Sequence, residues 1–208
     1  MNKTLLASLL VAALAAATHT AEAQRQARTG YEIKKIETDD PFSPDFGSNY
    51  GKRSTPQKWL ETEAEFEAEN PNDSELTEEL MFRYYIYFAD AIDAATGEPK
   101  PSIYSGEVTH VNVPDDRRLY SVMYISPQSL YRIFGKSVSP GTLGKYIAVE
   151  ILKDGQLVAV NFTSRPPNAA QEDWWNELDP VLGHLRNKNE TPFMPLVWDR
   201  YQEIKTRN

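Results

Sequence analysis

Aromatic side chains are the residues of this chain whose types and spacing best suit binding. Trp174 and Trp175 are adjacent, in a segment whose apolar residues have helical spacing. Adjacent residues on a helix point about 100° apart, so the two indoles cannot both face one core. We therefore expect one indole to be exposed beside Tyr85 or Tyr87, where it would stack on a sugar ring or on a partner protein. In the alternative, one indole is core and the other covers a neighbouring loop.

Residues for catalysis are scarce. Beyond the first 23 residues the chain has two histidines, His110 and His184, and neither has a carboxylate at metal-ligand spacing. The chain has no cysteine, no G-x-S-x-G sequence and no phosphate-binding loop. We expect no catalytic residue, no metal site and no cofactor. Paired carboxylates for glycoside hydrolysis are a matter of tertiary distance, so a small glycan hydrolase stays open as an alternative.

The first residues have the organisation of a cleavable secretory signal peptide. Lys3 supplies the positive start, residues 5–17 are apolar apart from Ser8, and residues 21–23 form an A-x-A cleavage site. An apolar helix of this length spans about 20 Å, too short for a hydrocarbon core of about 30 Å. We expect residues 1–23 to be removed and the mature protein to begin at Gln24. It would then be exported to the periplasm or the cell surface, without a transmembrane segment.

The remaining chain divides into a leader and one domain. Residues 24–58 are polar, carry several prolines and glycines, and show one short apolar alternation at Tyr31, Ile33 and Ile36. Such a composition buries little apolar area, so we expect a flexible polar leader. Residues 59–208 are expected to form a single domain. The formal net charge of −8 disfavours nucleic acid as a partner.

The domain shows the period-2 alternation of β-strands. Over residues 59–69, apolar or small residues alternate with five glutamates, which predicts a strand with one face in water, at a charged sheet edge. Further strands are expected over residues 80–89, 107–113 and 119–125. Asp154 and Gly155 predict a hairpin with a type I′ turn. Its register would pair Ile151 with Val158, Val149 with Val160, and Ile147 with Phe162.

Helices are expected to be few and short. Ser126 as N-cap, Pro127 at the first helical position and Gly135 after the last turn predict a helix over residues 127–134. The spacing over residues 174–185 predicts two more short helices, separated at Asp179 and Pro180.

The C-terminal residues 191–201 are expected to be extended and to end as a last strand, with Trp198 and Tyr201 attaching them to the core. Six or seven short antiparallel strands, two or three helical inserts and no βαβ alternation indicate a mainly β fold, an antiparallel β-sandwich.

Four runs of sequence resemble a known family: Trp59-Leu-Glu-Thr-Glu-Ala-Glu-Phe-Glu, Ser105-Gly-Glu-Val-Thr-His-Val-Asn-Val-Pro, Tyr120-Ser-Val-Met-Tyr-Ile-Ser-Pro and Thr191-Pro-Phe-Met-Pro-Leu-Val-Trp-Asp-Arg-Tyr. Together they resemble a family of small exported verrucomicrobial proteins, with type IV pilus-associated members in mucin-degrading gut bacteria. The resemblance implies an immunoglobulin-like sandwich, a cell-envelope location and a role linked to pili, and it implies no catalytic residue. The apolar run here precedes Ala23 and is removed with the signal, unlike the retained helix of a pilin, so an accessory or surface role is expected.

Two classes of function follow. The first is a non-enzymatic envelope protein that contacts protein partners, pilus components among them, through its sheet face or leader. The second is a carbohydrate-binding module or small glycan hydrolase that uses Trp174, Trp175, Tyr85 and Tyr87, or the abundant carboxylates.

Overall fold

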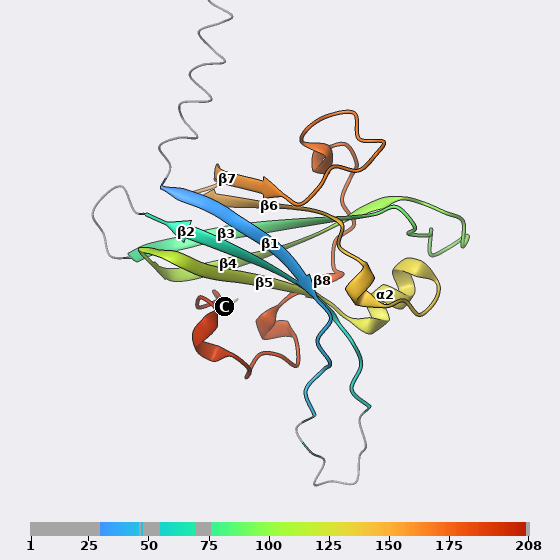
Figure 1. Cartoon of the computed structure of the whole chain (residues 1–208), viewed down its shortest axis with the longest axis horizontal. Helices are drawn as coiled ribbons and strands as arrows, with labels where there is room; N and C mark the ends of the chain where they lie inside the picture. The colour runs from blue at the N-terminus through green and yellow to red at the C-terminus, as the bar shows by residue number, and fades with distance from the viewer. Residues whose placement is uncertain (1–29, 46, 48–54, 70–75, 207–208) are drawn as a thin grey trace, which may run out of the picture.

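The computed structural model describes residues 30–45, 47, 55–69 and 76–206, which form two packed β-sheets (Figure 1). The first sheet has the order β1-β2-β5-β8 and the second the order β4-β3-β6-β7, and all paired strands are antiparallel. The first sheet contains β1 (Tyr31–Asp39), β2 (Leu60–Ala68), β5 (Asp116–Ile125) and β8 (Leu185–Asn187). The second contains β3 (Leu76–Phe88), β4 (Ser102–Pro114), β6 (Tyr146–Lys153) and β7 (Gln156–Phe162). The predicted antiparallel β-sandwich is confirmed.

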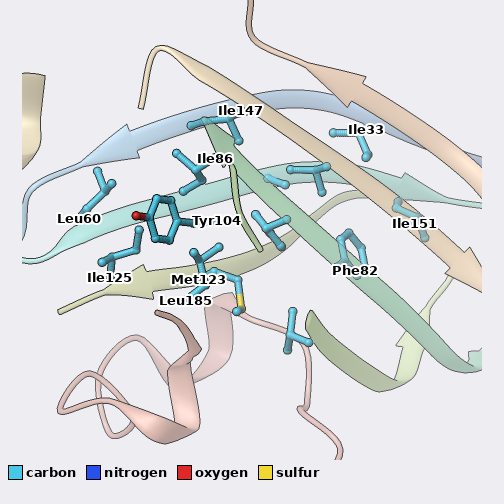
Figure 2. Close-up of a cluster of buried hydrophobic side chains, with 14 of the residues drawn as sticks. Ile33, Leu60, Phe82, Ile86, Tyr104, Met123, Ile125, Ile147, Ile151 and Leu185 are labelled. Carbon is cyan, nitrogen blue, oxygen red and sulfur yellow. The ribbon is translucent and has the colours of Figure 1, made fainter. Parts of the chain in front are cut away.

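The core lies between the two sheets and is built from alternate residues of each strand. Figure 2 shows Phe82, Ile86 and Ile147 of the second sheet facing Leu60 and Met123 of the first. These five side chains are at most 1% exposed, as the period-2 pattern requires of a strand with one face in the core. The core reaches the edge strands as well, because Ile33 of β1, Tyr104 of β4 and Leu185 of β8 belong to the same cluster.

Strand β1 corrects the predicted boundary of the leader. Residues 31–39, assigned from sequence to the flexible segment 24–58, pair with β2 along its whole length. The alternation looked too short because Ile33 and Ile36 are three residues apart, a spacing that puts them on opposite faces of a regular strand. A register shift between Ile33 and Lys35 turns Ile36 back onto the core. The expected signal peptide, residues 1–23, lies outside the described residues.

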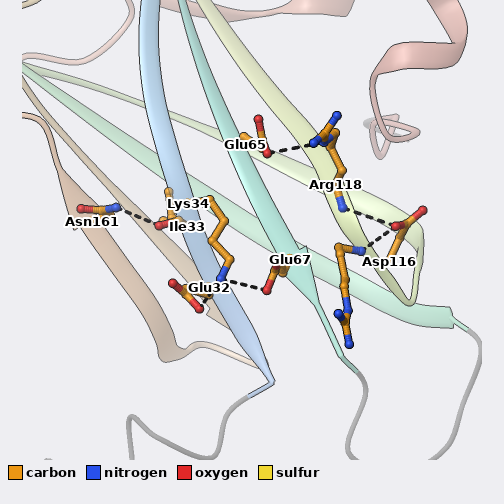
Figure 3. A network of polar contacts seen from close by, with 9 residues as sticks. Glu32, Ile33, Lys34, Glu65, Glu67, Asp116, Arg118 and Asn161 are labelled. Atoms are coloured by element: carbon orange, nitrogen blue, oxygen red, sulfur yellow. Dashed lines mark hydrogen bonds and ion pairs between the residues drawn. The ribbon is translucent and has the colours of Figure 1, made fainter.

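Strand β2 has the predicted alternation, but its predicted place at a sheet edge is wrong. It lies between β1 and β5, and its glutamates face cations supplied by the neighbouring strands (Figure 3). Lys34 lies 3.0 Å from the Glu67 carboxylate, and Arg118 lies 3.8 Å from that of Glu65. The acidic row can therefore occupy a central strand, because basic residues on both sides offset its charge.

The hairpin β6–β7 has the predicted turn and a different register. Asp154 and Gly155 have φ of 53° and 75°, the left-handed values that a type I′ turn needs. A register shift between Ile151 and Leu152 leaves Val158 without a partner, so Ile151 pairs with Ala159 instead of Val158. The extra residue shifts every later pair by one, which the sequence pattern did not reveal.

The helix α2 (Pro127–Phe134) is confirmed. The Ser126 hydroxyl accepts a hydrogen bond from the backbone amide of Ser129, and Gly135 ends the helix at φ 66°. Its apolar residues Leu130, Ile133 and Phe134 are buried, as their spacing predicted. No helix within the described ranges is long and apolar enough to cross a membrane.

The last forty residues differ most from expectation. They contain the short 3-10 helices η2 (Trp174–Asn176), η3 (Lys188–Glu190) and η4 (Trp198–Arg200), after η1 (Pro140–Thr142) earlier in the chain. The helix expected after Asp179 is absent, because Val181 instead bridges Tyr104 at the edge of β4. Residues 191–201 form turns and η4 instead of a strand.

Candidate functional site

The four aromatic residues predicted to bind do come together, but they are packed inside. Trp174, Trp175 and Tyr85 belong to one buried cluster on the outer face of the second sheet, and Tyr87 packs against it. Trp174 and Trp175 are only 2% and 5% exposed, with their ring centroids 5.7 Å apart. The prediction of an exposed indole is therefore wrong, because η2 folds over the sheet and directs both rings onto it.

This cluster holds a buried carboxylate. The Trp175 indole Nε1 donates a hydrogen bond of 2.9 Å to Glu150 Oε1, and the Tyr85 hydroxyl donates one of 3.2 Å to Glu150 Oε2. Arg83 lies 3.7 Å from the same carboxylate. Desolvation raises the pKa of Tyr85, which keeps its hydroxyl protonated as a donor. Trp175 and Tyr85 thus orient the Glu150 carboxylate instead of presenting a free ring to solvent.

The one serine–histidine pair that the described residues form by hydrogen bonding cannot act on a substrate. His110 Nε2 lies 2.9 Å from the Ser121 hydroxyl, but His110 is 1% exposed and Ser121 is fully buried between the sheets. Burial lowers the pKa of His110 to about 4, so the ring is neutral. The pair is therefore part of the core and cannot act as a catalytic nucleophile, because a nucleophile must be reachable by its substrate.

A better candidate lies on the outer face of the first sheet, where the C-terminal segment is attached by aromatic contacts. The Phe193 ring stacks on Tyr124 of β5, with centroids 4.7 Å apart and planes at 10°. The Trp59 ring lies perpendicular to the same ring, with centroids 5.6 Å apart. Phe193 is thus held from two sides, and it fixes the start of the turn that follows.

Charged contacts fix the other end of this segment. Arg200 makes a two-pronged ion pair with Glu63 of β2, at 2.9 and 2.5 Å, and its guanidinium lies 3.8 Å above the Tyr120 ring. The Tyr201 hydroxyl donates a 2.6 Å hydrogen bond to Glu63. The ion pair raises the pKa of Arg200, and burial raises that of Tyr201. Two anchors therefore hold residues 194–199 in place between them.

Lys188 supports residues 194–199 from their buried side. It is only 4% exposed, and its ammonium donates a 3.0 Å hydrogen bond to the Met194 carbonyl. The ammonium also lies 5.6 Å from the centre of the Trp198 ring and 5.5 Å from that of Tyr201. Burial lowers the pKa of Lys188. Contact with the faces of aromatic rings stabilises a desolvated cation, so Lys188 orients Trp198.

Between the anchors, large apolar side chains face solvent. Trp198 is 67% exposed and Val197 is 61% exposed, beside the partly exposed Met194 and Leu196. Val197 has φ 47° and ψ 46°, a left-handed conformation that costs a β-branched residue about 1–2 kcal/mol. We call residues 194–198 the C-terminal apolar loop. A cleft of about 510 Å³ opens beside it, lined by Trp198, Tyr201 and polar residues that include Asn189 and Gln202.

Sequence reasoning missed this site because it assigned Trp198 to the core. The signal was present: Pro192 and Pro195 interrupt any strand over residues 191–198 and favour turns, which leave side chains outside a sheet. Tyr201 is attached to the sheet as predicted, but Trp198 is not.

Fold and site together define a β-sandwich protein whose exposed features are suited to binding. A family model matches residues 21–208, and the chain belongs to that family. A crystal structure of a protein from Akkermansia muciniphila, a verrucomicrobial mucin-degrading gut bacterium, superposes with a TM-score of 0.70 at 29% sequence identity. That match covers 86% of this chain and 93% of the other. The resemblance to small verrucomicrobial proteins is thereby confirmed, and neither comparison points to a known class of enzymes. The comparison with curated proteins gave no significant match.

Proposed function

We propose that this protein is a non-catalytic, exported component of the cell envelope that binds protein partners, type IV pilus components among them, through its C-terminal apolar loop. The observation that carries the proposal is the exposure of Trp198 and Val197 on a segment anchored at both ends. Tryptophan is enriched among the residues that dominate protein interfaces. A rigid loop also loses little conformational entropy on binding.

The strain at Val197 supports the same reading. A β-branched residue held at positive φ persists only where the surrounding contacts impose it, and such positions concentrate at binding sites. The contacts of Phe193, Lys188 and Arg200 impose it here. The export signal expected at residues 1–23 supports the envelope location, and the resemblance of the four sequence runs to pilus-associated proteins supports the link to pili.

Co-purification from intact, crosslinked cells tests the proposal. Trp198→Ala should lower the recovery of pilus components about tenfold or more, since loss of a central interface tryptophan costs about 2 kcal/mol or more. Tyr131→Ala is the matched control, because Tyr131 is another largely exposed aromatic residue, on α2. Equal recovery with the two variants would refute the role of the loop.

A second candidate is carbohydrate binding at the same place. Lys188 covers one face of the Trp198 indole, the ring is largely exposed, and Asn189 and Gln202 line the adjoining cleft. An indole face flanked by amide groups is suited to a sugar ring. Purified protein that binds mucin glycans on an array, and loses this binding with Trp198→Ala, would favour the carbohydrate-binding function.

A further inference from the structure

A groove of about 900 Å³ follows strand β7. Tyr31 and Ile33 at the start of β1 form one wall, and the turn carrying Asp173 and Trp175 forms the other. Leu157, Val158 and Val160 of β7 line it between these walls. The Asn161 amide donates a 2.8 Å hydrogen bond to the Ile33 carbonyl and so holds β1 and β7 together (Figure 3).

The charge that lines the groove is entirely negative. Its lining includes Glu32, Glu150, Glu172 and Asp173, and no lysine or arginine. Two neighbouring cations reduce this charge, because Lys34 pairs with Glu32 at 2.7 Å and Arg83 lies near Glu150. Among the described residues, Glu172 and Asp173 have no ion-pair partner, so an excess of negative charge remains.

Glu150 is the carboxylate of the groove whose orientation is fixed by hydrogen bonds. Its carboxylate is oriented by the hydrogen bonds from Trp175 and Tyr85, and its side chain is 10% exposed. A carboxylate can accept about four hydrogen bonds, so acceptor capacity remains for a ligand cation. Because the group is already oriented, it needs no reorganisation when a cation arrives.

The backbone beside the groove also offers binding capacity. Strand β7 is the last strand of its sheet and, in the described part of the chain, pairs only with β6. An unpaired strand edge is a template for a further strand. A peptide that adds to such an edge places alternate side chains on opposite faces. One set would lie on the outer face with Val160 and the carboxylates, because Val160 pairs with Glu150, and the other set would lie toward Val158 and Ala159, which pack against the core.

We propose that this groove binds an extended, positively charged peptide segment of a protein partner, aligned with β7 as an additional strand. Apolar residues of the peptide would contact Val158 and Ala159, and its lysines or arginines would extend over Val160 toward Glu150, Glu172 and Asp173. The groove belongs to the edge of the second sheet, whereas the C-terminal apolar loop covers the outer face of the first. The two proposals can therefore fail independently.

Titration with a hexapeptide of alternating arginine and valine tests this proposal. We expect saturable binding by calorimetry and a shift of the Trp175 indole N–H resonance. The double variant Glu172→Gln/Asp173→Asn should weaken binding about fivefold or more, because it removes two charges that would pair with the peptide, and exposed ion pairs are individually weak. The control Asp90→Asn/Glu98→Gln removes the same charge from the exposed loop between β3 and β4 and should leave binding unchanged.

Three further probes separate strand addition from charge alone. The same peptide with alternate backbone nitrogens methylated should bind at least tenfold more weakly, because it cannot pair with a strand edge. Spermine and a hexapeptide of alternating glutamate and valine should not bind. Equal binding of spermine or of the methylated peptide would overturn the proposal. So would a Trp175 signal that shifts when residues 24–29 are deleted without peptide, since the chain's own basic segment would then occupy the groove.

Discussion

Protonation of His110 should make the stability of the sandwich depend on pH between 7 and 4. The Gln202 carbonyl, 3.2 Å from Nδ1, can only accept, so Nδ1 carries the ring proton and Nε2 accepts from the Ser121 hydroxyl. A second proton on Nε2 would force the Ser121 hydroxyl to turn and accept, and it would place a charge in the core beside the Phe82 ring. Burial accordingly lowers the pKa of His110 from 6.5 to about 4.

The sign and size of the effect follow from this shift. The unfolded chain binds the proton at a higher pH than the folded one, so the contribution is complete above pH 6.5 and is lost as the pH falls toward 4. From pH 7.5 to 4.5 the loss is about 2.5 kcal/mol. Carboxylates add their own pH dependence, and a variant without the imidazole separates the two contributions.

Urea unfolding of the wild type and of His110→Gln, over this pH range, measures how much the protonation of His110 changes the free energy of unfolding. The variant should be less stable at pH 7.5, because it disturbs two buried hydrogen bonds. The gap between the two proteins should then shrink by about 2–3 kcal/mol as the pH falls to 4.5. A gap that stays constant within about 0.5 kcal/mol would refute a buried, neutral His110.

Three other predictions concern the ends of the chain. Mass spectrometry of the exported protein should show Gln24 as its first residue; protein that retains Met1 would contradict the signal peptide. A chain that begins at Trp59 should have a free energy of unfolding at least about 5 kcal/mol lower than one that begins at Gly30, because it loses the buried Tyr31 and Ile33 and exposes the edge of β2. Equal unfolding midpoints would instead support a flexible leader over residues 24–58. Arg200→Ala should speed proteolysis within residues 194–206 at a cost of about 1 kcal/mol or less in stability, whereas replacement of an exposed arginine without an ion pair should not.

Local chemistry made part of this fold predictable from sequence. The caps of α2 depend on Ser126 and Gly135, and the turn of the hairpin depends on Asp154 and Gly155, so short-range rules suffice. The sandwich itself follows from the period-2 alternation of apolar residues along the strands, which predicts strands that bury one face or both.

The predictions from sequence were wrong where one extra residue, or a partner remote in the sequence, determines the register or the position of a strand. An extra residue at Val158 shifts the register of the hairpin, and an irregularity after Ile33 hides β1, and neither changes the composition. The glutamates of β2 looked like an edge because Lys34, Arg118 and Arg200 are remote in sequence.

The candidate site depended even more on tertiary structure. Helical geometry predicted that Trp174 and Trp175 diverge, but η2 is a single tight turn that lies across a sheet wide enough to bury both rings. Trp198 looked like a core residue although Pro192 and Pro195 favoured a turn there, and the packing of Phe193, Lys188 and Arg200 determines that it is held outside.

Site-specific photocrosslinking in intact cells tests the central claim most directly. A photoreactive phenylalanine analogue at position 198 replaces the exposed indole within the C-terminal apolar loop, and the same analogue at position 131 on α2 is the control. The account predicts a discrete adduct at position 198 that mass spectrometry identifies as an envelope protein of the pilus machinery, and no such adduct at position 131. No adduct at position 198, or the same adducts from both positions, would contradict it.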